Sequence, residues 1–302
     1  MQLPLSVTVV EVGPRDGLQN EGASISTADK IAFVNALSEA GHRVIEVTAF
    51  VSPKWVPQMA DAADVLAGIT RRPGTRYTAL APNAKGLERA MAAGVDEIAI
   101  FAAASETFSR RNINQSIAES LSTYRGVCRT AAAGGVRVRA YLSTCFVCPF
   151  EGRVDPTRVA EVSSALVDMG AYEVAVSDTI GAATPGDVFR VLEAVSPRVP
   201  IGQVALHFHD TRGTALANVL AGLDGGVTTF DSSAGGLGGC PFAPGAAGNL
   251  ATEDLLFMLE GLGIATGVSL DRVAAASRLV ERHLGHHLPS RYLGAPALTS
   301  RA

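Results

Sequence analysis

Residues 172–210 read YEVAVSDTIGAATPGDVFRVLEAVSPRVPIGQVALHFHD, and this stretch indicates the fold class. Its runs at 172–178 and 204–210 are rich in β-branched and apolar residues, which is typical of buried strands. The segment between them, 185–195, spaces its apolar residues as a helix does. A strand, a helix and a second strand in this order predict a βαβ unit with parallel strands.

The same alternation runs through the chain. Eight strand-like runs occur at 6–12, 43–49, 76–81, 97–103, 138–144, 172–178, 204–210 and 228–234. Amphipathic segments separate most of them, at 27–40, 84–93, 114–133, 156–169, 185–195 and 214–223. Several of these segments end at a glycine, as at Gly41, Gly94 and Gly170, which is typical of helix termini.

Eight βα units without a Gly/Ser-rich linker predict an α/β fold, a (β/α)8 TIM barrel. We expect one catalytic domain over residues 1–302, with the barrel at about 6–265 and a C-terminal helical extension at about 266–302. A doubly wound nucleotide-binding fold is disfavoured, because the turn after the first strand reads GPRDG and lacks the dinucleotide fingerprint.

Composition excludes several classes of partner. The 302 residues carry a net charge of -4 with no block of like charges, so we expect no nucleic-acid partner. Charged residues or glycine interrupt every apolar run, so no membrane span is expected. Four cysteines at irregular spacing are typical of free thiols in a reducing compartment. Since the N-terminus shows no targeting signal, a cytoplasmic location is expected.

His207 and His209 lie two residues apart on one predicted strand, so both side chains leave the same face. In a barrel they would point into the mouth at the carboxyl end of that strand, where active sites of this fold lie. For an isolated His-x-His pair, two hydrogen-bonded histidines that fill the top layer of the barrel are an equally good interpretation.

Two further residues favour a metal site. Asp16 follows the first strand, and Asn249 lies in the connection after the eighth strand. The first, seventh and eighth strands become neighbours when a barrel closes, so these side chains can meet the two histidines. Two imidazoles, a carboxylate and an amide oxygen suit Mg2+ or Mn2+. Taken singly, Asp16 is better explained by an Asx-turn and Asn249 by a helix N-cap.

Four other residues are candidates for the chemistry. Arg15 could donate two hydrogen bonds to a thioester or enolate oxygen, or form a surface ion pair. Glu46 is a charge inside a buried strand and needs a partner, either Arg15 or the metal site. Asp178 ends the sixth strand, where it would face the mouth or cap the next turn. Cys240 lies in a glycine-rich loop at 236–241, which makes its thiol a candidate acid.

Three long stretches, at 11–21, 45–59 and 236–254, resemble hydroxymethylglutaryl-CoA lyases, and the resemblance spans nearly the whole chain. It implies a barrel fold, a divalent cation and a homodimer. The metal ligands that it implies are Asp16, His207, His209 and Asn249. Arg15 matches the catalytic arginine, Glu46 and Asp178 match supporting acids, and Cys240 matches the catalytic thiol.

The implied reaction is cleavage of (S)-3-hydroxy-3-methylglutaryl-CoA, an acyl-CoA thioester, to acetyl-CoA and acetoacetate. Asp16 or His207 is the hypothesis for the base that accepts the hydroxyl proton. The chain departs from the family pattern at Ser177, Arg212 and residues 234–235. A lyase for a longer-branched substrate such as the isohexenyl compound is therefore one alternative. A condensing enzyme that joins acetyl-CoA to a 2-oxo acid and a noncatalytic binding barrel are the others.

Overall fold

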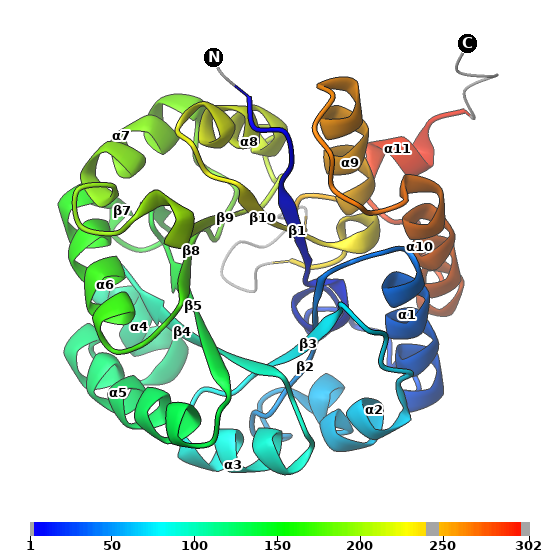
Figure 1. The fold of residues 1–302 in the computed structure, drawn as a ribbon, viewed down its shortest axis with the longest axis horizontal. Helices are drawn as coiled ribbons and strands as arrows, with labels where there is room; N and C mark the ends of the chain where they lie inside the picture. Colours follow the sequence, from blue (N-terminus) through cyan, green and yellow to red (C-terminus); the bar gives the residue numbers. More distant parts are fainter. Residues whose placement is uncertain (1–2, 240–247, 297–302) are drawn as a thin grey trace.

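Eight parallel strands close into a barrel in the order β1-β10-β9-β8-β5-β4-β3-β2, as Figure 1 shows. The computed structural model describes residues 3–239 and 248–296. The barrel strands are β1 Thr8–Glu11, β2 Val44–Ala49, β3 Arg76–Leu80, β4 Glu97–Ala103, β5 Arg137–Ser143, β8 Glu173–Asp178, β9 Val204–Phe208 and β10 Thr229–Ser232. The predicted (β/α)8 barrel is confirmed, and each predicted strand overlaps an observed one.

Helices surround the strands on the outside of the ring. They are α1 Thr27–Glu39, α2 Ala62–Gly68, α3 Ala84–Ala92, α4 Glu106–Ile113, α5 Ile117–Ala133, α6 Pro156–Asp168, α7 Pro185–Val195, α8 Ala215–Asp224 and α9 Thr252–Gly261. The predicted additional C-terminal helices are present as α10 Leu270–Leu284 and the short α11 Arg291–Gly294. Gly41, Gly94 and Gly170 have φ of 104°, 70° and 107°, so glycine does end these three helices.

Two short helices and one hairpin are among the elements that were not predicted. They are the short helices α2 and α4 and the hairpin of β6 Val147–Cys148 and β7 Gly152–Arg153. Each is too short to show a clear periodicity in the sequence, so their positions depend on packing against longer elements. Of these, α4 bears on function because it contributes two residues, Phe108 and Asn112, to the wall of the main cavity.

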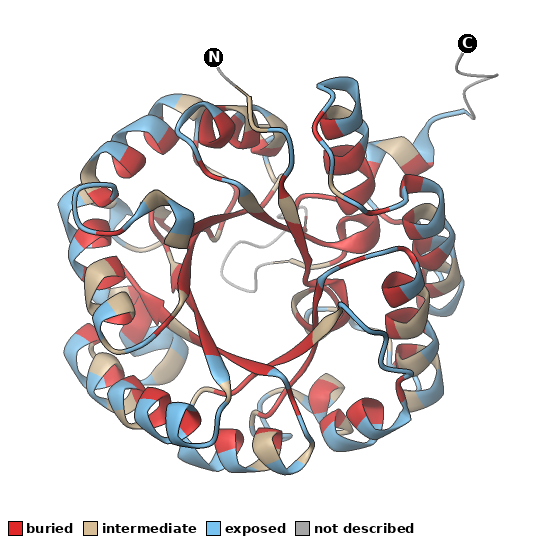
Figure 2. Cartoon of the chain, viewed as in Figure 1, coloured by how far each residue is buried: buried red, intermediate tan, exposed pale blue. Residues whose placement is uncertain are grey.

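The barrel interior differs from the layer between strands and helices. Between the layers lies one large hydrophobic core, and in Figure 2 the buried residues follow the strands and the inner faces of the helices. Inside the barrel, β5 directs alternate residues inward, because side chains along a strand alternate between faces. Arg139 lies deep in the interior, and Tyr141 and Ser143 line the cavity above it.

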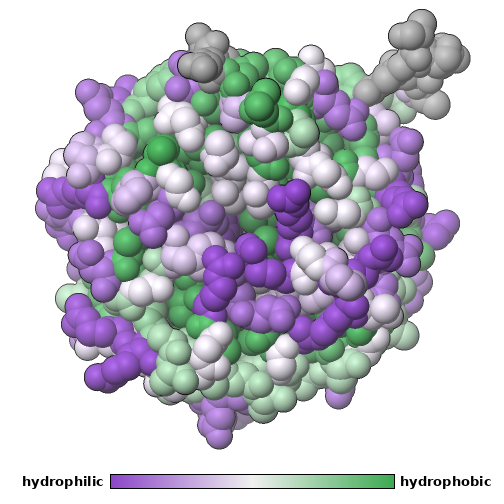
Figure 3. Space-filling model, in the orientation of Figure 1, coloured by the Kyte–Doolittle hydropathy of each residue, from purple (hydrophilic) through white to green (hydrophobic). Residues whose placement is uncertain are grey.

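Within residues 3–239 and 248–296, no helix has both the length and the apolar character that crossing a bilayer requires. On the face seen in Figure 3, hydrophilic residues gather near the centre, among scattered hydrophobic ones.

Candidate active site

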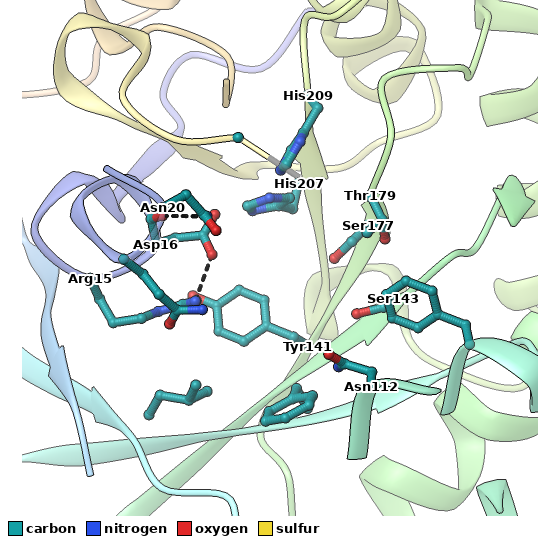
Figure 4. Close-up of a pocket in the computed structure, with 15 residues that line it drawn as sticks. Arg15, Asp16, Asn20, Asn112, Tyr141, Ser143, Ser177, Thr179, His207 and His209 are labelled. Atoms are coloured by element: carbon teal, nitrogen blue, oxygen red, sulfur yellow. Dashed lines mark hydrogen bonds and ion pairs between the residues drawn. The ribbon is translucent and has the colours of Figure 1, made fainter. Parts of the chain in front are cut away.

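A cavity of about 180 Å³ opens at the carboxyl ends of the barrel strands. One part of its wall is polar and includes Arg15, Asp16, His207 and His209. The rest is formed by Gln19, Asn20, Leu80, Phe101, Phe108, Asn112, Tyr141, Ser143, Ser177, Thr179 and Gly239. Figure 4 shows the polar side chains pointing toward one another across this space.

A π-helical turn, Gly13–Gly17, places Arg15 and Asp16 directly after β1. Val12 follows the strand, and its carbonyl oxygen accepts a hydrogen bond from Asp16 N at 2.7 Å, which tightens the turn. A Cβ at Gly13 would lie 2.6 Å from Glu11 Oε1, so a larger residue there would have to displace the buried Glu11 carboxylate. Such wide turns occur frequently at functional sites, and this one turns two successive charged residues toward the barrel mouth.

The seventh barrel strand supplies the two histidines. His207 lies within β9 and His209 directly after it, with ring centroids 5.3 Å apart. Ligand atoms of Asp16, His207 and His209 all lie within 4.8 Å of one another. The structure thus brings together three of the four predicted metal ligands in an arrangement consistent with a divalent cation.

Asn249 joins this group through the connection between β10 and α9. A β-bridge pairs it with His209, and its Nδ2 donates to Asp16 Oδ2 at 2.9 Å and to Leu237 O at 3.0 Å. The loop can approach so closely only because Gly238, with φ of 127°, has no side chain. A Cβ there would lie 2.5 Å from Asn249 Nδ2.

Two buried polar atoms at this place have no hydrogen-bond partner within the described chain. They are Asn249 Oδ1 and His209 Nδ1. Unpaired buried acceptors are costly, because they lose their hydrogen bonds to water without replacement. A cation that accepts lone pairs from oxygen and nitrogen would satisfy such groups, so the residues present fit a divalent cation.

The protonation states also favour a cation. Burial acts to raise the pKa of Asp16, but Arg15 and the two histidines lower it to about 2. Burial, together with the neighbouring His207, lowers the pKa of His209 to about 4. Near neutral pH the carboxylate is therefore ionised and the His209 imidazole is neutral, which are the states that bind metal.

Arg15 is held by two carboxylates. Its Nε donates to Glu46 Oε2 at 2.6 Å, and its Nη1 donates to Asp16 Oδ1 at 2.6 Å. Tyr141 donates its hydroxyl to the same Glu46 oxygen at 3.0 Å, while its ring lies 5.3 Å from the Arg15 guanidinium carbon. Burial raises the pKa of Glu46, and Arg15 opposes that shift. This arrangement fixes the orientation of Arg15 at the edge of the cavity.

Asp178 is not among the residues that line the cavity. Its two carboxylate oxygens accept hydrogen bonds from Ala182 N at 3.0 Å and Ala183 N at 2.9 Å. Its neighbour Ser177 pairs in register with His207 and lines the cavity instead. Asp178 therefore stabilises the turn after β8, which is the capping arrangement that the sequence left open.

Two other positions singled out in the sequence have different outcomes. Cys240 lies outside the described residues, so its predicted role as a thiol acid remains a prediction. Arg212 donates its Nη1 to the carbonyl oxygens of Ile180 and Gly181, at 3.1 and 2.9 Å. Its guanidinium thus binds the loop that follows β8.

Several residues of the site were not predicted. Tyr141 holds Glu46, and below it Arg139 binds Asp231, whose Oδ2 lies 3.2 Å from His207 Nδ1. A signal was present, because Arg139 and Asp231 are charges inside strand-like runs, as Glu46 is. A buried charge needs a partner, and this holds for Arg139 and Asp231 as it does for Glu46.

Comparison with known proteins is consistent with this geometry. A family model described as HMGL-like matches residues 6–280. A Pseudomonas aeruginosa protein named 3-hydroxy-3-isohexenylglutaryl-CoA/hydroxy-methylglutaryl-CoA lyase is 54% identical over 302 residues, which cover 100% of both chains.

Two solved structures are also similar. The HMG-CoA lyase of Bacillus subtilis has a TM-score of 0.96 at 51% identity and covers 97% of this chain and 99% of its own. An Acinetobacter baumannii HMG-CoA lyase, solved with coenzyme A and 3-methylmalate, has a TM-score of 0.93 at 39% identity. That match covers 98% of this chain and 97% of the other.

Proposed function

Because the chain belongs to the HMGL-like family, we propose that it is a carbon-carbon lyase that cleaves (S)-3-hydroxy-3-methylglutaryl-CoA to acetyl-CoA and acetoacetate. The observation that carries the proposal is the cluster of Asp16, His207 and His209 beside the buried Arg15. A scaffold that only bound a partner would have no use for an arginine held between two carboxylates beside a group of potential metal ligands.

The reaction is a retro-Claisen cleavage. The tertiary hydroxyl loses its proton and becomes the ketone of acetoacetate. The bond to the thioester's α-carbon breaks, and its electron pair forms the enolate of acetyl-CoA. That enolate then takes a proton at carbon. The site must therefore remove one proton, stabilise an enolate oxygen and return one proton.

Arg15 is placed to stabilise the enolate oxygen. Two of the five guanidinium N–H donors are bound to Glu46 and Asp16, which leaves others for an oxygen atom in the cavity. The carboxylates orient these donors before substrate binds, and preorganised donors of this kind contribute roughly 3 kcal/mol to transition-state stabilisation. In this proposal Glu46 positions Arg15, and Asp178 holds the loop that carries Thr179.

Asp16, His207, His209 and Asn249 would hold Mg2+ or Mn2+. When bound, the cation would supply Lewis-acid polarisation of substrate oxygen atoms. Asp16 or His207 is the hypothesis for the group that accepts the hydroxyl proton, and Cys240 is the hypothesis for the group that donates a proton to the enolate carbon. Solvent isotope effects and pH–rate profiles of Asp16→Asn, His207→Asn and Cys240→Ser would assign these steps.

The test is release of acetyl-CoA from 3-hydroxy-3-methylglutaryl-CoA by the purified protein. We expect release with Mn2+ or Mg2+, its loss after treatment with EDTA and its return when the cation is restored. A parallel reaction with acetyl-CoA and a 2-oxo acid tests the condensing alternative. Thiol release that requires both of those compounds would contradict the lyase proposal.

A longer-branched substrate is a second candidate, which the name of the Pseudomonas aeruginosa relative favours. Leu80, Phe101 and Phe108 give the cavity an apolar wall against which an alkyl branch could lie. We expect Phe108→Ala to shift kcat/KM toward isohexenylglutaryl-CoA over hydroxymethylglutaryl-CoA by about tenfold, the usual worth of a few methylene contacts. An unchanged ratio would place the branch elsewhere.

We also propose a cytoplasmic homodimer. The described cysteines, Cys128, Cys145 and Cys148, are free thiols, which suits a reducing compartment. An apolar hollow of about 560 Å³, lined in part by Phe257, Tyr292 and Leu293, is a surface that a partner could cover. Sedimentation equilibrium tests the dimer, and a monomer at micromolar concentration would contradict it.

A further inference from the structure

The His207 side chain that faces the cavity is bound from behind by a carboxylate. Asp231 on β10 pairs in register with His207 on β9, so both side chains leave the sheet at the same level and on the same face. Asp231 Oδ2 lies 3.2 Å from His207 Nδ1. Both side chains are almost fully buried, so water does not compete for this contact.

Asp231 is itself held in place by Arg139. The guanidinium reaches across the barrel interior from β5, and its Nη1 and Nη2 donate to the two Asp231 oxygens at 3.1 and 2.7 Å. A two-point contact of this kind fixes the plane of a carboxylate as well as its position. The Asp231 carboxylate therefore has one orientation, in which one oxygen also faces His207.

Asp231 is not the only buried carboxylate that can balance the positive charge of Arg139. Arg139 Nε also donates to Glu173 Oε1 at 2.7 Å, so this arginine has a second buried carboxylate as partner. One cation thus faces two anions, and only one of those anions contacts a residue of the cavity. The two carboxylates together carry one negative charge more than Arg139 balances, and Asp231 is the one of the two that also contacts His207.

We propose that Asp231 is a positioning residue for the cation site. It holds the His207 imidazole with the proton on Nδ1, so that the Nε2 lone pair is presented toward Asp16 and His209. Figure 4 shows His207 between His209 and Asp16 at this wall of the cavity. A carboxylate behind a metal-binding histidine orients the ring and raises its basicity, and its loss typically weakens metal binding 10- to 100-fold. This inference rests on the proposed cation site and adds residues behind the ligands.

The test compares Asp231→Asn with Glu173→Gln in the full chain. Mn2+ dissociation constants are measured without any CoA ester, by titration calorimetry and by the electron paramagnetic resonance of free Mn2+. We expect Asp231→Asn to weaken Mn2+ binding by 10- to 100-fold. Glu173→Gln, which removes a carboxylate from the same arginine without touching His207, should change it less than about threefold. Asp231→Asn should also regain most of its kcat at saturating Mn2+.

Two results would overturn the proposal. One is wild-type Mn2+ affinity in Asp231→Asn, and the other is equal weakening in both variants, which would indicate a general effect on barrel packing. If Asp231→Asn does not fold, nitrogen-15 NMR of histidine in the wild-type protein decides, because a His207 proton on Nε2 contradicts the proposal. Tight Mn2+ binding without lyase activity would refute the proposed function and leave this inference standing.

Discussion

Buried carboxylates in two regions of the molecule have pKa values shifted in opposite directions. In the barrel interior, Asp16 and Asp231 each contact an arginine, and both have a pKa below the ordinary value although burial acts to raise it. Beneath the connection from β10 to α9, Glu11 and Glu253 bind backbone amides and hydroxyl groups. Burial raises the pKa of Glu11 to about 8 and that of Glu253 to about 7.

The difference shows what the arginines contribute. Glu11 accepts hydrogen bonds from Gly13 N, Ala234 N and Thr252 Oγ1, each at 2.8 Å, and these do not offset the loss of water. A guanidinium in direct contact does offset it for Asp16. Burial is common to both regions, and contact with an arginine lowers the pKa of Asp16 and Asp231, whereas Glu46, which shares Arg15 with Asp16, keeps a raised pKa.

The largest expected effect follows from removal of Arg15. Arg15→Gln should lower kcat by about 10²- to 10³-fold, because a preorganised donor to the enolate oxygen is lost. Mn2+ binding near neutral pH should change little, because Arg15→Gln removes both the charge that favours ionised Asp16 and a positive charge, 2.6 Å from Asp16, that repels a cation. Steady-state kinetics at saturating Mn2+ and Mn2+ titration separate the two effects.

Arg158→Gln is the matched control, because Arg158 is half exposed on α6, forms an ion pair with Glu161 and does not line the cavity. It should leave kcat unchanged. If Arg15→Gln kept the wild-type kcat, the arginine contact that distinguishes the barrel interior from the other region would have no role in catalysis.

Replacement of Glu253 tests the other region. Because its folded pKa of about 7 lies above the ordinary value of 4.5, the stability that it contributes is fully present below pH 4.5 and is lost as pH rises toward 7. Glu253→Gln should remove that loss, which is roughly 3 kcal/mol at most. Its unfolding free energy should match the wild type near pH 4 and exceed it near pH 8.

Urea unfolding of the cation-free protein at a series of pH values measures this effect. Wild-type and variant curves that run parallel from pH 4 to 8 would show that Glu253 titrates at its ordinary pKa. The pKa of this buried carboxyl would then not be raised, and the contrast with Asp16 and Asp231 would be lost.

The smallest effect is expected from Tyr141→Phe. This change removes the hydroxyl that donates to Glu46 at 3.0 Å but keeps the ring beside Arg15. A hydrogen bond to a charged group is worth about 1.5–3 kcal/mol. Because Arg15 remains bound to Glu46, we expect a loss of kcat of about tenfold and a lower melting temperature. A loss as large as that of Arg15→Gln would indicate that Tyr141 itself contacts the reacting atoms.

Much of the fold was predictable, because long periodic segments carry their own signal. The eight strands and the helices α1, α3, α5, α6, α7 and α8 follow from the spacing of apolar residues. The helices α2 and α4 and the hairpin at β6 and β7 are stabilised by contacts with distant segments, which no local pattern records. The pairing of His207 with His209 on one face was predictable for the same reason as the strands, since side chains alternate along a strand.

The sequence by itself determined the barrel, the inward direction of the two histidines and the stretches that resemble a lyase family. Only the tertiary structure decided that Asp178 caps a turn, that Arg15 lies between Glu46 and Asp16, and that Asp231 supports His207. The physical reason is the separation along the chain between the residues that determine each property. Hydrophobic periodicity is a property of neighbouring residues, whereas the charge state of a buried side chain depends on partners that barrel closure brings within 3 Å from far along the chain.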